Sequence, residues 1–227
     1  MKKWKYMVGI LLLLGTIIAC QKAGAYMLNQ IQTKADAGKE KITVVIDAGH
    51  GSTDPGKVGI NDVLEKDVNL FIAKKLNKYL EQKGITVVMT REDDSTMADS
   101  KSADLSARVR LINQTKPNLA VSIHQNSYTS ESVKGAQVFY HKNSEEGKAA
   151  AEILQETLLQ VDPENNRQAK ADTNYYLLKN TEVPLVIVEC GFLSNSEEAE
   201  KLKSEEYQNQ IAEAICSGII KYLENYK

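Results

Sequence analysis

The stretch ITVVIDAGH, residues 42–50, sets the pattern from which the fold is predicted. It is an apolar run rich in Val and Ile, which is typical of a buried strand, and it stops at His50. Two further runs stop at polar residues: NLAVSIH (118–124) at His124 and PLVIVE (184–189) at Glu189. Ligands of open α/β sheets gather at the carboxyl ends of the strands. These three side chains are therefore expected at one edge of a sheet.

Strand-like and helix-like segments alternate from Lys41 onward. Apolar runs predict strands at 42–47, 85–90, 119–124, 136–140, 175–178 and 185–189. Apolar residues at helical spacing predict helices at 63–83, 103–115 and 145–160, and two more within 197–226. This alternation predicts an α/β fold: a single three-layer domain whose mostly parallel, roughly six-stranded twisted sheet is flanked by helices.

Composition limits the functional classes. The chain has 227 residues, 42% of them hydrophobic, which suits one well-cored domain of roughly 150–200 residues. Its formal charge of −2 lacks the basic surplus that nucleic-acid binding requires, so no nucleic-acid partner is expected. Three cysteines are too few for a disulfide scaffold. Cys190 and Cys216 stand in apolar runs and are interpreted as small buried residues, although a bridge between them stays open.

Residues 1–25 have the pattern of a targeting segment. Three lysines lie within residues 1–5, and an uncharged run rich in Leu and Ile follows from Tyr6 to Ala19. This apolar core suits an export signal, because a membrane-spanning helix needs about 20 apolar residues. Cleavage at the A-x-A of residues 23–25, lipid attachment at Cys20 and retention as a membrane anchor all stay open. We predict an extracytoplasmic protein with membrane contact through this segment, a polar linker at 26–40 and a catalytic domain at 41–227.

The strand-end residues and one further glutamate form a candidate metal site. Glycines lie on both sides of His50, as expected of a loop that passes close to a ligand. Glu65 follows this loop at the start of the first long predicted helix, so the chain can fold it back beside His50. Two imidazoles, of His50 and His124, and the Glu65 carboxylate make up a catalytic zinc set with an open fourth position. Glu189 is the candidate for the proton shuttle that such a site needs.

Each of these residues also has a purely structural interpretation. A strand-end histidine is commonly just hydrogen-bonded, and Glu65 in a first helical turn would favour the helix dipole. Glu189 could pair with an arginine inside the fold. His141, the third histidine, precedes a polar loop and is interpreted as a surface residue. The metal hypothesis therefore depends on the conjunction of residues.

Taken in order, motifs along residues 42–226 resemble those of the zinc-dependent N-acetylmuramoyl-L-alanine amidases, the type-3 cell-wall amidase family. They are VVIDAGHGSTDPGKVG (44–59), LEKDVNL (64–70), MTREDD (89–94), LSARVRLIN (105–113), SIHQNS (122–127) and YYLLKNTEVPLVIVECGFLSN (175–195). The G-H-G alone is weakly specific, whereas S-I-H-x-N followed by E-x-G-F-L-S-N is highly specific. Ser52 departs from the pattern, since the family usually has a second glycine there; we expect little effect on zinc binding unless the loop backbone shifts.

The resemblance implies roles for particular residues. His50, Glu65 and His124 would bind one Zn²⁺ per chain, and Glu189 would be the catalytic carboxylate. These are the same four residues that the strand ends and the position of Glu65 after the His50 loop indicate.

Three further residues acquire roles from the resemblance alone. Asn126 would lie near the substrate, and Arg91 and Arg108 would brace the framework.

The resemblance also implies an activity, namely hydrolysis of the amide bond between the lactyl group of N-acetylmuramic acid and L-alanine in peptidoglycan. A lone catalytic domain behind a hydrophobic segment is similar to the germination-specific, spore-cortex branch, whose members strip peptides from muramic acid so that muramic-δ-lactam can form. Peptidoglycan or muropeptides are the implied partners, and whether an activating protein is required stays open. Two alternatives remain: another zinc peptidase or deacylase acting on the wall, and a catalytically silent wall-binding protein.

Overall fold

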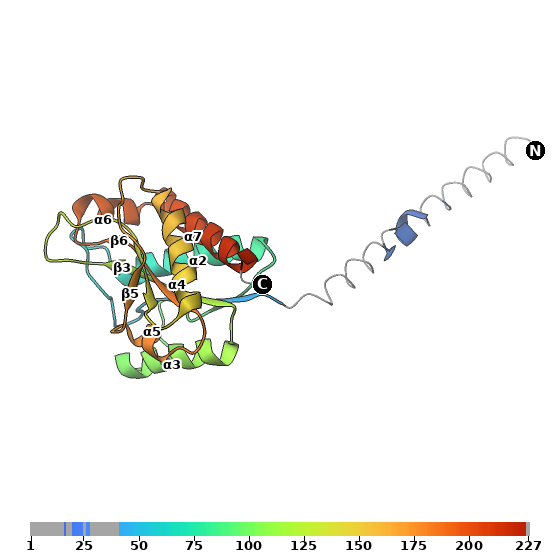
Figure 1. Cartoon of the computed structure of the whole chain (residues 1–227), viewed down its shortest axis with the longest axis horizontal. Helices are drawn as coiled ribbons and strands as arrows, with labels where there is room; N and C mark the ends of the chain where they lie inside the picture. Colours follow the sequence, from blue (N-terminus) through green and yellow to red (C-terminus); the bar gives the residue numbers. More distant parts are fainter. Residues whose placement is uncertain (1–15, 17–19, 25, 28–40, 226–227) are drawn as a thin grey trace, which may run out of the picture. The chain divides into compact units, whose positions relative to one another are not determined.

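The computed structural model describes residues 16, 20–24, 26–27 and 41–225 (Figure 1). The chain divides into two compact units, Met1–Lys41 and Ile42–Lys227. Most of the predicted export segment and all but two residues of the predicted linker lie outside the described residues. Within the described ranges, no helix is long and apolar enough to cross a membrane.

A six-stranded sheet, ordered β2-β1-β3-β6-β4-β5, forms the centre of the second unit. The strands are β1 (Thr43–Ala48), β2 (Thr86–Met89), β3 (Leu119–Asn126), β4 (Gln137–His141), β5 (Lys170–Asp172) and β6 (Leu185–Phe192). The four neighbouring strands β2, β1, β3 and β6 are parallel to one another. The strand β4 is antiparallel to β6, and β5 is parallel to β4. The predicted mostly parallel, six-stranded sheet is confirmed.

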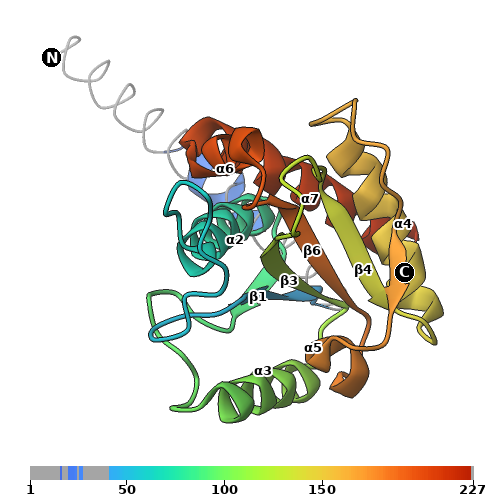
Figure 2. The same ribbon diagram turned by 90° about the vertical axis from the view of Figure 1, so that its left-hand side faces the viewer.

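Helices cover both faces of this sheet, but unequally. One face carries α3 (Lys101–Thr115) and the short α5 (Tyr176–Asn180), at the bottom of Figure 2. The other face carries α2 (Glu65–Gln82), α4 (Glu145–Leu159), α6 (Ser196–Lys203) and α7 (Glu205–Asn225). The predicted three-layer architecture is therefore confirmed.

Side chains from the sheet build a separate core on each face. The larger core takes Ile46, Val121 and Val188 from the central strands, together with residues of α2, α4, α6 and α7. The smaller core takes the intervening positions Val45 and Ile187, which pack with α3 and α5 residues. Cys190 and Cys216 belong to the larger core as free, buried cysteines, which confirms their interpretation as small buried residues.

One predicted strand is wrong. Residues 176–178 belong to the helix α5, which Tyr175 directly precedes, and the fifth strand is instead β5, whose residues are mostly exposed. A four-residue apolar run does not distinguish a strand from a buried helical turn, and here Leu177 and Leu178 are both buried. The Asp172 carboxylate accepts the backbone N–H groups of Asn174 and Tyr175, which turns the chain between β5 and α5.

Candidate metal centre

Strand alternation places the polar strand-end residues on the less covered face. Successive side chains of a strand point to opposite faces. His124 follows Ala120 by an even number of residues, and Glu189 follows Ile187 in the same way, so both point to the face of the smaller core. His124 and Glu189 are also direct partners on the parallel strands β3 and β6. The two side chains are therefore neighbours at the carboxyl edge of the sheet.

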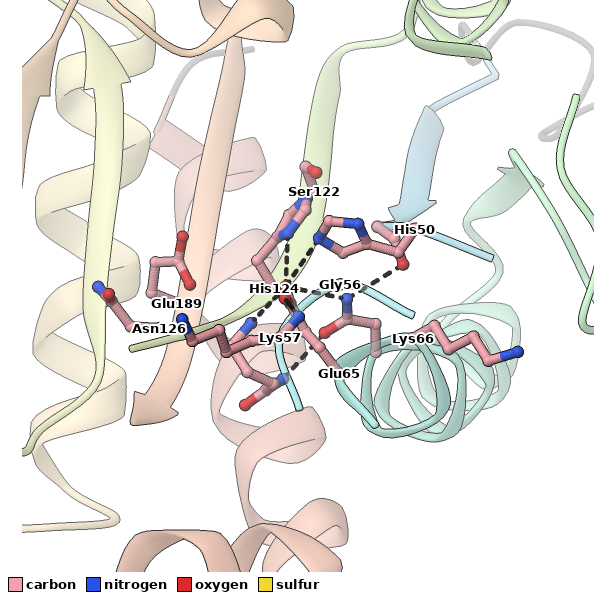
Figure 3. A network of polar contacts seen from close by, with 12 residues as sticks. His50, Gly56, Lys57, Glu65, Lys66, Ser122, His124, Asn126 and Glu189 are labelled. Atoms are coloured by element: carbon pink, nitrogen blue, oxygen red, sulfur yellow. Dashed lines mark hydrogen bonds and ion pairs between the residues drawn. The ribbon is translucent and has the colours of Figure 1, made fainter. Parts of the chain in front are cut away.

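Three of the predicted residues come together in the structure. His50 Nε2 lies 3.2 Å, and His124 Nδ1 lies 2.8 Å, from the same Glu65 oxygen, Oε1. The two imidazole rings are 5.0 Å apart and nearly perpendicular, at 79° (Figure 3). One ligand atom from each of the three residues lies within 4.8 Å of the others. This group could hold a metal ion, and its nitrogen and oxygen donors are of the kind that bind Zn²⁺.

Glu65 is held as an ionised carboxylate. Its side chain is buried at the first residue of α2, where Lys57 N–H donates to Oε2 and Gln125 N–H to Oε1. Burial alone would raise the pKa of Glu65, but the hydrogen bonds and charges of His124 and His50 outweigh it and hold the pKa far below its usual value. The carboxylate is thus negatively charged at neutral pH.

His124 has the complementary electrostatic behaviour. Burial by itself lowers the pKa of His124, but the hydrogen bond and charge of Glu65 dominate and raise it to about 9. A cation is therefore favoured between these side chains, and a metal ion would replace the imidazole proton in that role.

His50 is oriented by a carboxylate that sequence reasoning missed. Asp54 Oδ2 lies 2.9 Å from His50 Nδ1. A carboxylate acceptor at Nδ1 favours the tautomer whose lone pair is on Nε2, the atom that faces Glu65. Burial tends to raise the pKa of Asp54, but hydrogen bonds from His50 and Gly56 lower it to about 2. An acidic residue four positions after His50 was the available sequence signal.

The backbone at His50 is unusual and is anchored by two buried arginines. His50 has φ of 62°, in the left-handed region that non-glycine residues seldom adopt. Arg108 donates to the His50 carbonyl at 2.8 Å, and Arg91 donates to the Gly49 carbonyl at 3.0 Å. The expectation that both arginines brace the framework is confirmed.

Two glycines allow the loop to pass against the metal-site side chains. A Cβ on Gly49 would lie 2.3 Å from the His124 ring, closer than any real contact. Gly56 has φ of 67°, and a Cβ there would lie 2.5 Å from Glu65 Oε2 and 2.6 Å from His50 Cδ2. Both positions therefore exclude a side chain for steric reasons.

Ser52, the departure from the family pattern, also lies in the left-handed region, with φ of 48°. Its N–H donates to Asp94 Oδ1 at 2.8 Å, and its carbonyl accepts from Lys66 Nζ at 2.9 Å. The serine thus adopts the backbone conformation for which a glycine is suited, and these two contacts hold it there.

Glu189 has one bound and one free carboxylate oxygen. The Tyr175 hydroxyl donates to Oε1 at 3.0 Å, whereas Oε2 is buried and has no hydrogen-bond partner among the described residues. Burial is the main cause of a raised pKa at Glu189. The alternative of a structural arginine pair at Glu189 is not what the described residues show, since the observed partner is Tyr175. Sequence reasoning missed Tyr175 because its segment was predicted to be a strand.

The two remaining candidates, Asn126 and His141, each lie at the end of a strand. Asn126 ends β3, two residues after His124, and its Oδ1 accepts the N–H of Ser127 at 2.8 Å. His141 ends the antiparallel strand β4. It therefore lies near the amino ends of the parallel strands, on the other side of the sheet from their carboxyl ends, and it is half-buried. It lines a hollow of about 450 Å³ that includes none of the four central residues.

A smaller hollow adjoins the centre itself. Its volume is about 40 Å³, and its lining includes His50 and His124 together with Lys101, Leu105 and Leu177. The last three belong to α3 and α5, so the two helices of the less covered face form a wall beside the candidate metal centre.

Comparison with known proteins gives consistent matches. Residues 44–221 match the family described as N-acetylmuramoyl-L-alanine amidase. The germination-specific N-acetylmuramoyl-L-alanine amidase of Bacillus subtilis is 38% identical over 187 residues, which are 79% of this chain and 78% of that protein. The CwlD amidase of Clostridioides difficile, solved in complex with the GerS lipoprotein, aligns with a TM-score of 0.78 and 40% identity over 81% of this chain and 99% of that chain. The catalytic domain of CwlV from Bacillus (Paenibacillus) polymyxa var. colistinus aligns with a TM-score of 0.74 and 35% identity over 81% and 98% of the two chains.

Proposed function

This chain belongs to the N-acetylmuramoyl-L-alanine amidase family, and from that premise we propose that His50, Glu65 and His124 bind one Zn²⁺ while Glu189 transfers protons. The protein is a hydrolase that cleaves the amide bond between the lactyl group of N-acetylmuramic acid and L-alanine in peptidoglycan. The observation that carries the assignment of residues is the convergence of four strand-end and helix-end side chains at one edge of the sheet.

The donor set supports zinc as the metal. Two imidazole nitrogens and one carboxylate oxygen form the ligand set of many catalytic zinc sites, which keep a fourth position open. Neighbouring groups fix the ligands, since Asp54 orients His50 and Lys57 holds Glu65. Zinc bound there would polarise the scissile carbonyl and lower the pKa of a water molecule towards about 7.

Glu189 supplies the acid–base chemistry in this proposal. Burial raises the pKa of its carboxyl towards neutral pH. Such a pKa suits a group that both accepts and returns a proton. It takes a proton from the attacking water and delivers it to the departing L-alanine amine. Asn126, at the end of β3, is proposed to contact the substrate beside it.

The proposal is tested on purified peptidoglycan by mass analysis of the fragments, with and without a chelator. Glu189→Gln is expected to keep its metal and to lose about 10²–10⁴-fold in turnover, which is the usual contribution of general acid–base catalysis. His50→Ala and His124→Ala are expected to lose the metal itself. Near-normal activity of Glu189→Gln would exclude the proposed role of this residue.

The products distinguish the alternatives. An amidase releases peptides that begin with L-alanine and leaves free lactyl groups on muramic acid, whereas a wall peptidase would cut elsewhere and release D-amino acids. Wall binding without any cleavage, under every metal condition, would instead support a silent binding protein.

The relatives also suggest where the protein acts. Cell-wall amidases act outside the cytoplasm, so this chain acts in the cell envelope. We propose that residues 1–25 export it and hold it at the membrane, and that spore cortex is its substrate, because the B. subtilis relative is germination-specific. A lipoprotein partner is proposed from the complex of the C. difficile relative. Loss of muramic-δ-lactam from the cortex of a deletion strain would support the cortex assignment, and an unchanged cortex would contradict it.

A further inference from the structure

The contacts of Glu189 indicate a further residue for the reaction, on the premise that the proposed function is right. Tyr175 Oη lies 3.0 Å from Glu189 Oε1, and Oε2 of the same carboxyl is buried without a partner among the described residues. We propose that Tyr175 is a positioning residue that fixes Glu189 through Oε1 and leaves Oε2 as the oxygen that exchanges protons with the substrate and water.

Tyr175 is well placed to hold a carboxyl because its own position is fixed twice. The Asp172 carboxylate accepts the Tyr175 backbone N–H at 3.2 Å, which sets the chain just before α5. The aromatic ring packs against Phe139 of β4, with ring centroids 5.4 Å apart and planes tilted by 54°. Because Phe139 of the sheet and the turn at Asp172 already fix Tyr175, its hydroxyl does not need to be ordered during the reaction.

The free oxygen has a physical reason to be the working one. A buried carboxylate oxygen without a hydrogen bond costs free energy, and a catalytic role is one of the reasons for which proteins retain such an oxygen. His124 is the direct partner of Glu189 on the adjacent strand, so the Glu189 carboxyl belongs to the same edge of the sheet as the candidate metal centre. With Oε1 engaged by the hydroxyl, Oε2 is the oxygen whose acceptor positions are left for water and the leaving amine.

The hydrogen bond from Tyr175 suits both halves of the proton transfer. In the first half, one O–H bond of water breaks and its proton forms a bond to Oε2. In the second half, that proton leaves Oε2 and forms the new N–H bond of the L-alanine amine. The tyrosine keeps its own proton throughout, because burial and the charge of Glu189 raise the pKa of Tyr175 far above neutrality.

Tyr175→Phe tests the proposal, with Tyr176→Phe as the matched control. Tyr176 is the adjacent, exposed tyrosine, and its hydroxyl contacts Ser106 Oγ at 3.1 Å instead of Glu189. We expect Tyr175→Phe to lower kcat about 10- to 100-fold, the effect of removing one hydrogen bond to a charged group, with KM unchanged. Rates are expressed per bound metal ion, so a loss of folded protein does not enter the comparison. Tyr176→Phe should match the unmodified protein.

A double-mutant cycle with Glu189→Gln separates positioning from other roles. If Tyr175 acts through Glu189, Tyr175→Phe should change the residual rate of Glu189→Gln by about twofold or less. An unchanged kcat in Tyr175→Phe overturns the proposal, and so does an equal loss in both backgrounds, which would mean that Tyr175 acts independently. Full activity of Glu189→Gln alone would instead overturn the proposed function, so the two failures are distinguishable.

Discussion

At the residue scale, His50, Glu65 and Glu189 share one arrangement, in which a polar atom holds the side chain in place. His50 Nδ1 faces Asp54, Glu65 Oε2 accepts from the Lys57 N–H, and Glu189 Oε1 accepts from Tyr175. The opposite atom of each side chain faces the centre or has no hydrogen-bond partner among the residues that the structure describes. Such prior ordering lowers the cost of assembling a reactive geometry, since the side chains need not be fixed when substrate arrives.

The raised pKa of His124 predicts a pH dependence of the metal-stripped protein. Burial lowers this pKa, but the hydrogen bond and charge of Glu65 raise it from 6.5 to about 9. The resulting stability is fully present below the unfolded value and is lost as pH rises through about 9. Chelator-treated protein should therefore unfold at a higher temperature at about pH 6 than at about pH 9.5. Metal affinity should change in the opposite direction, because the metal needs the neutral imidazole.

Two variants control this measurement. Chelator-treated His124→Asn should lose the pH-dependent part of its stability, whereas His141→Asn, which changes the histidine near the amino ends of the parallel strands, should retain it. The assignment to His124 is wrong if both variants keep the same dependence as the unmodified protein.

The candidate ligands could be predicted from sequence, whereas their supporting groups could not. His50, His124 and Glu189 each end a recognisable strand, and parallel strands bring such ends to one edge. Asp54 and Tyr175 acquire meaning only through the atoms that they face. Which of several nearby acids or tyrosines makes such a contact depends on loop geometry, and apolar periodicity carries no information on it.

At the scale of elements, Arg108 joins α3 to β1 and to the loop that carries His50. Its guanidinium is buried and lies 2.7 Å from carboxylate oxygens of both Asp47 and Asp104. Arg108→Met should lower the free energy of unfolding by about 3–5 kcal/mol, because a buried carboxylate loses its partner. It should also weaken metal binding, since the His50 carbonyl loses a donor. Urea unfolding and metal titration measure the two effects.

Arg110→Met on the same helix is the matched control, because Arg110 is exposed. A surface substitution of this kind usually changes stability by about 0.5 kcal/mol or less. Equal losses in the two variants would show that helix propensity, and not the buried ion pairs, accounts for the effect.

Helices and central strands were predicted to within a few residues because their apolar pattern is long. The spacing of 63–83 predicted α2, and the run 185–189 predicted β6. β5 gave no such pattern, since its residues are mostly exposed and it pairs at the sheet edge with β4 alone. Edge pairing depends on backbone hydrogen bonds, which residue type reports poorly.

At the scale of the whole molecule, the second unit contains every group that the proposed reaction uses. Both cores and the four central residues lie within Ile42–Lys227. A protein that begins at Lys41 should therefore fold, bind metal and hydrolyse soluble muropeptides as the full chain does. Circular dichroism, metal content and kcat/KM check this expectation. A clear loss in any of them would contradict the predicted catalytic domain of residues 41–227.

The unequal covering of the two sheet faces has a consequence for how this architecture can diversify. The thick layer of α2, α4, α6 and α7 holds the larger core, whereas α3, α5 and the connections around them border the metal centre. Insertions and substitutions in α3, α5 and their connections alter the surroundings of the metal centre while leaving the larger core intact. New substrate preferences can thus be acquired there at little risk to foldability, because the residues that border the metal centre and the larger core that stabilises the fold lie on opposite faces of the sheet.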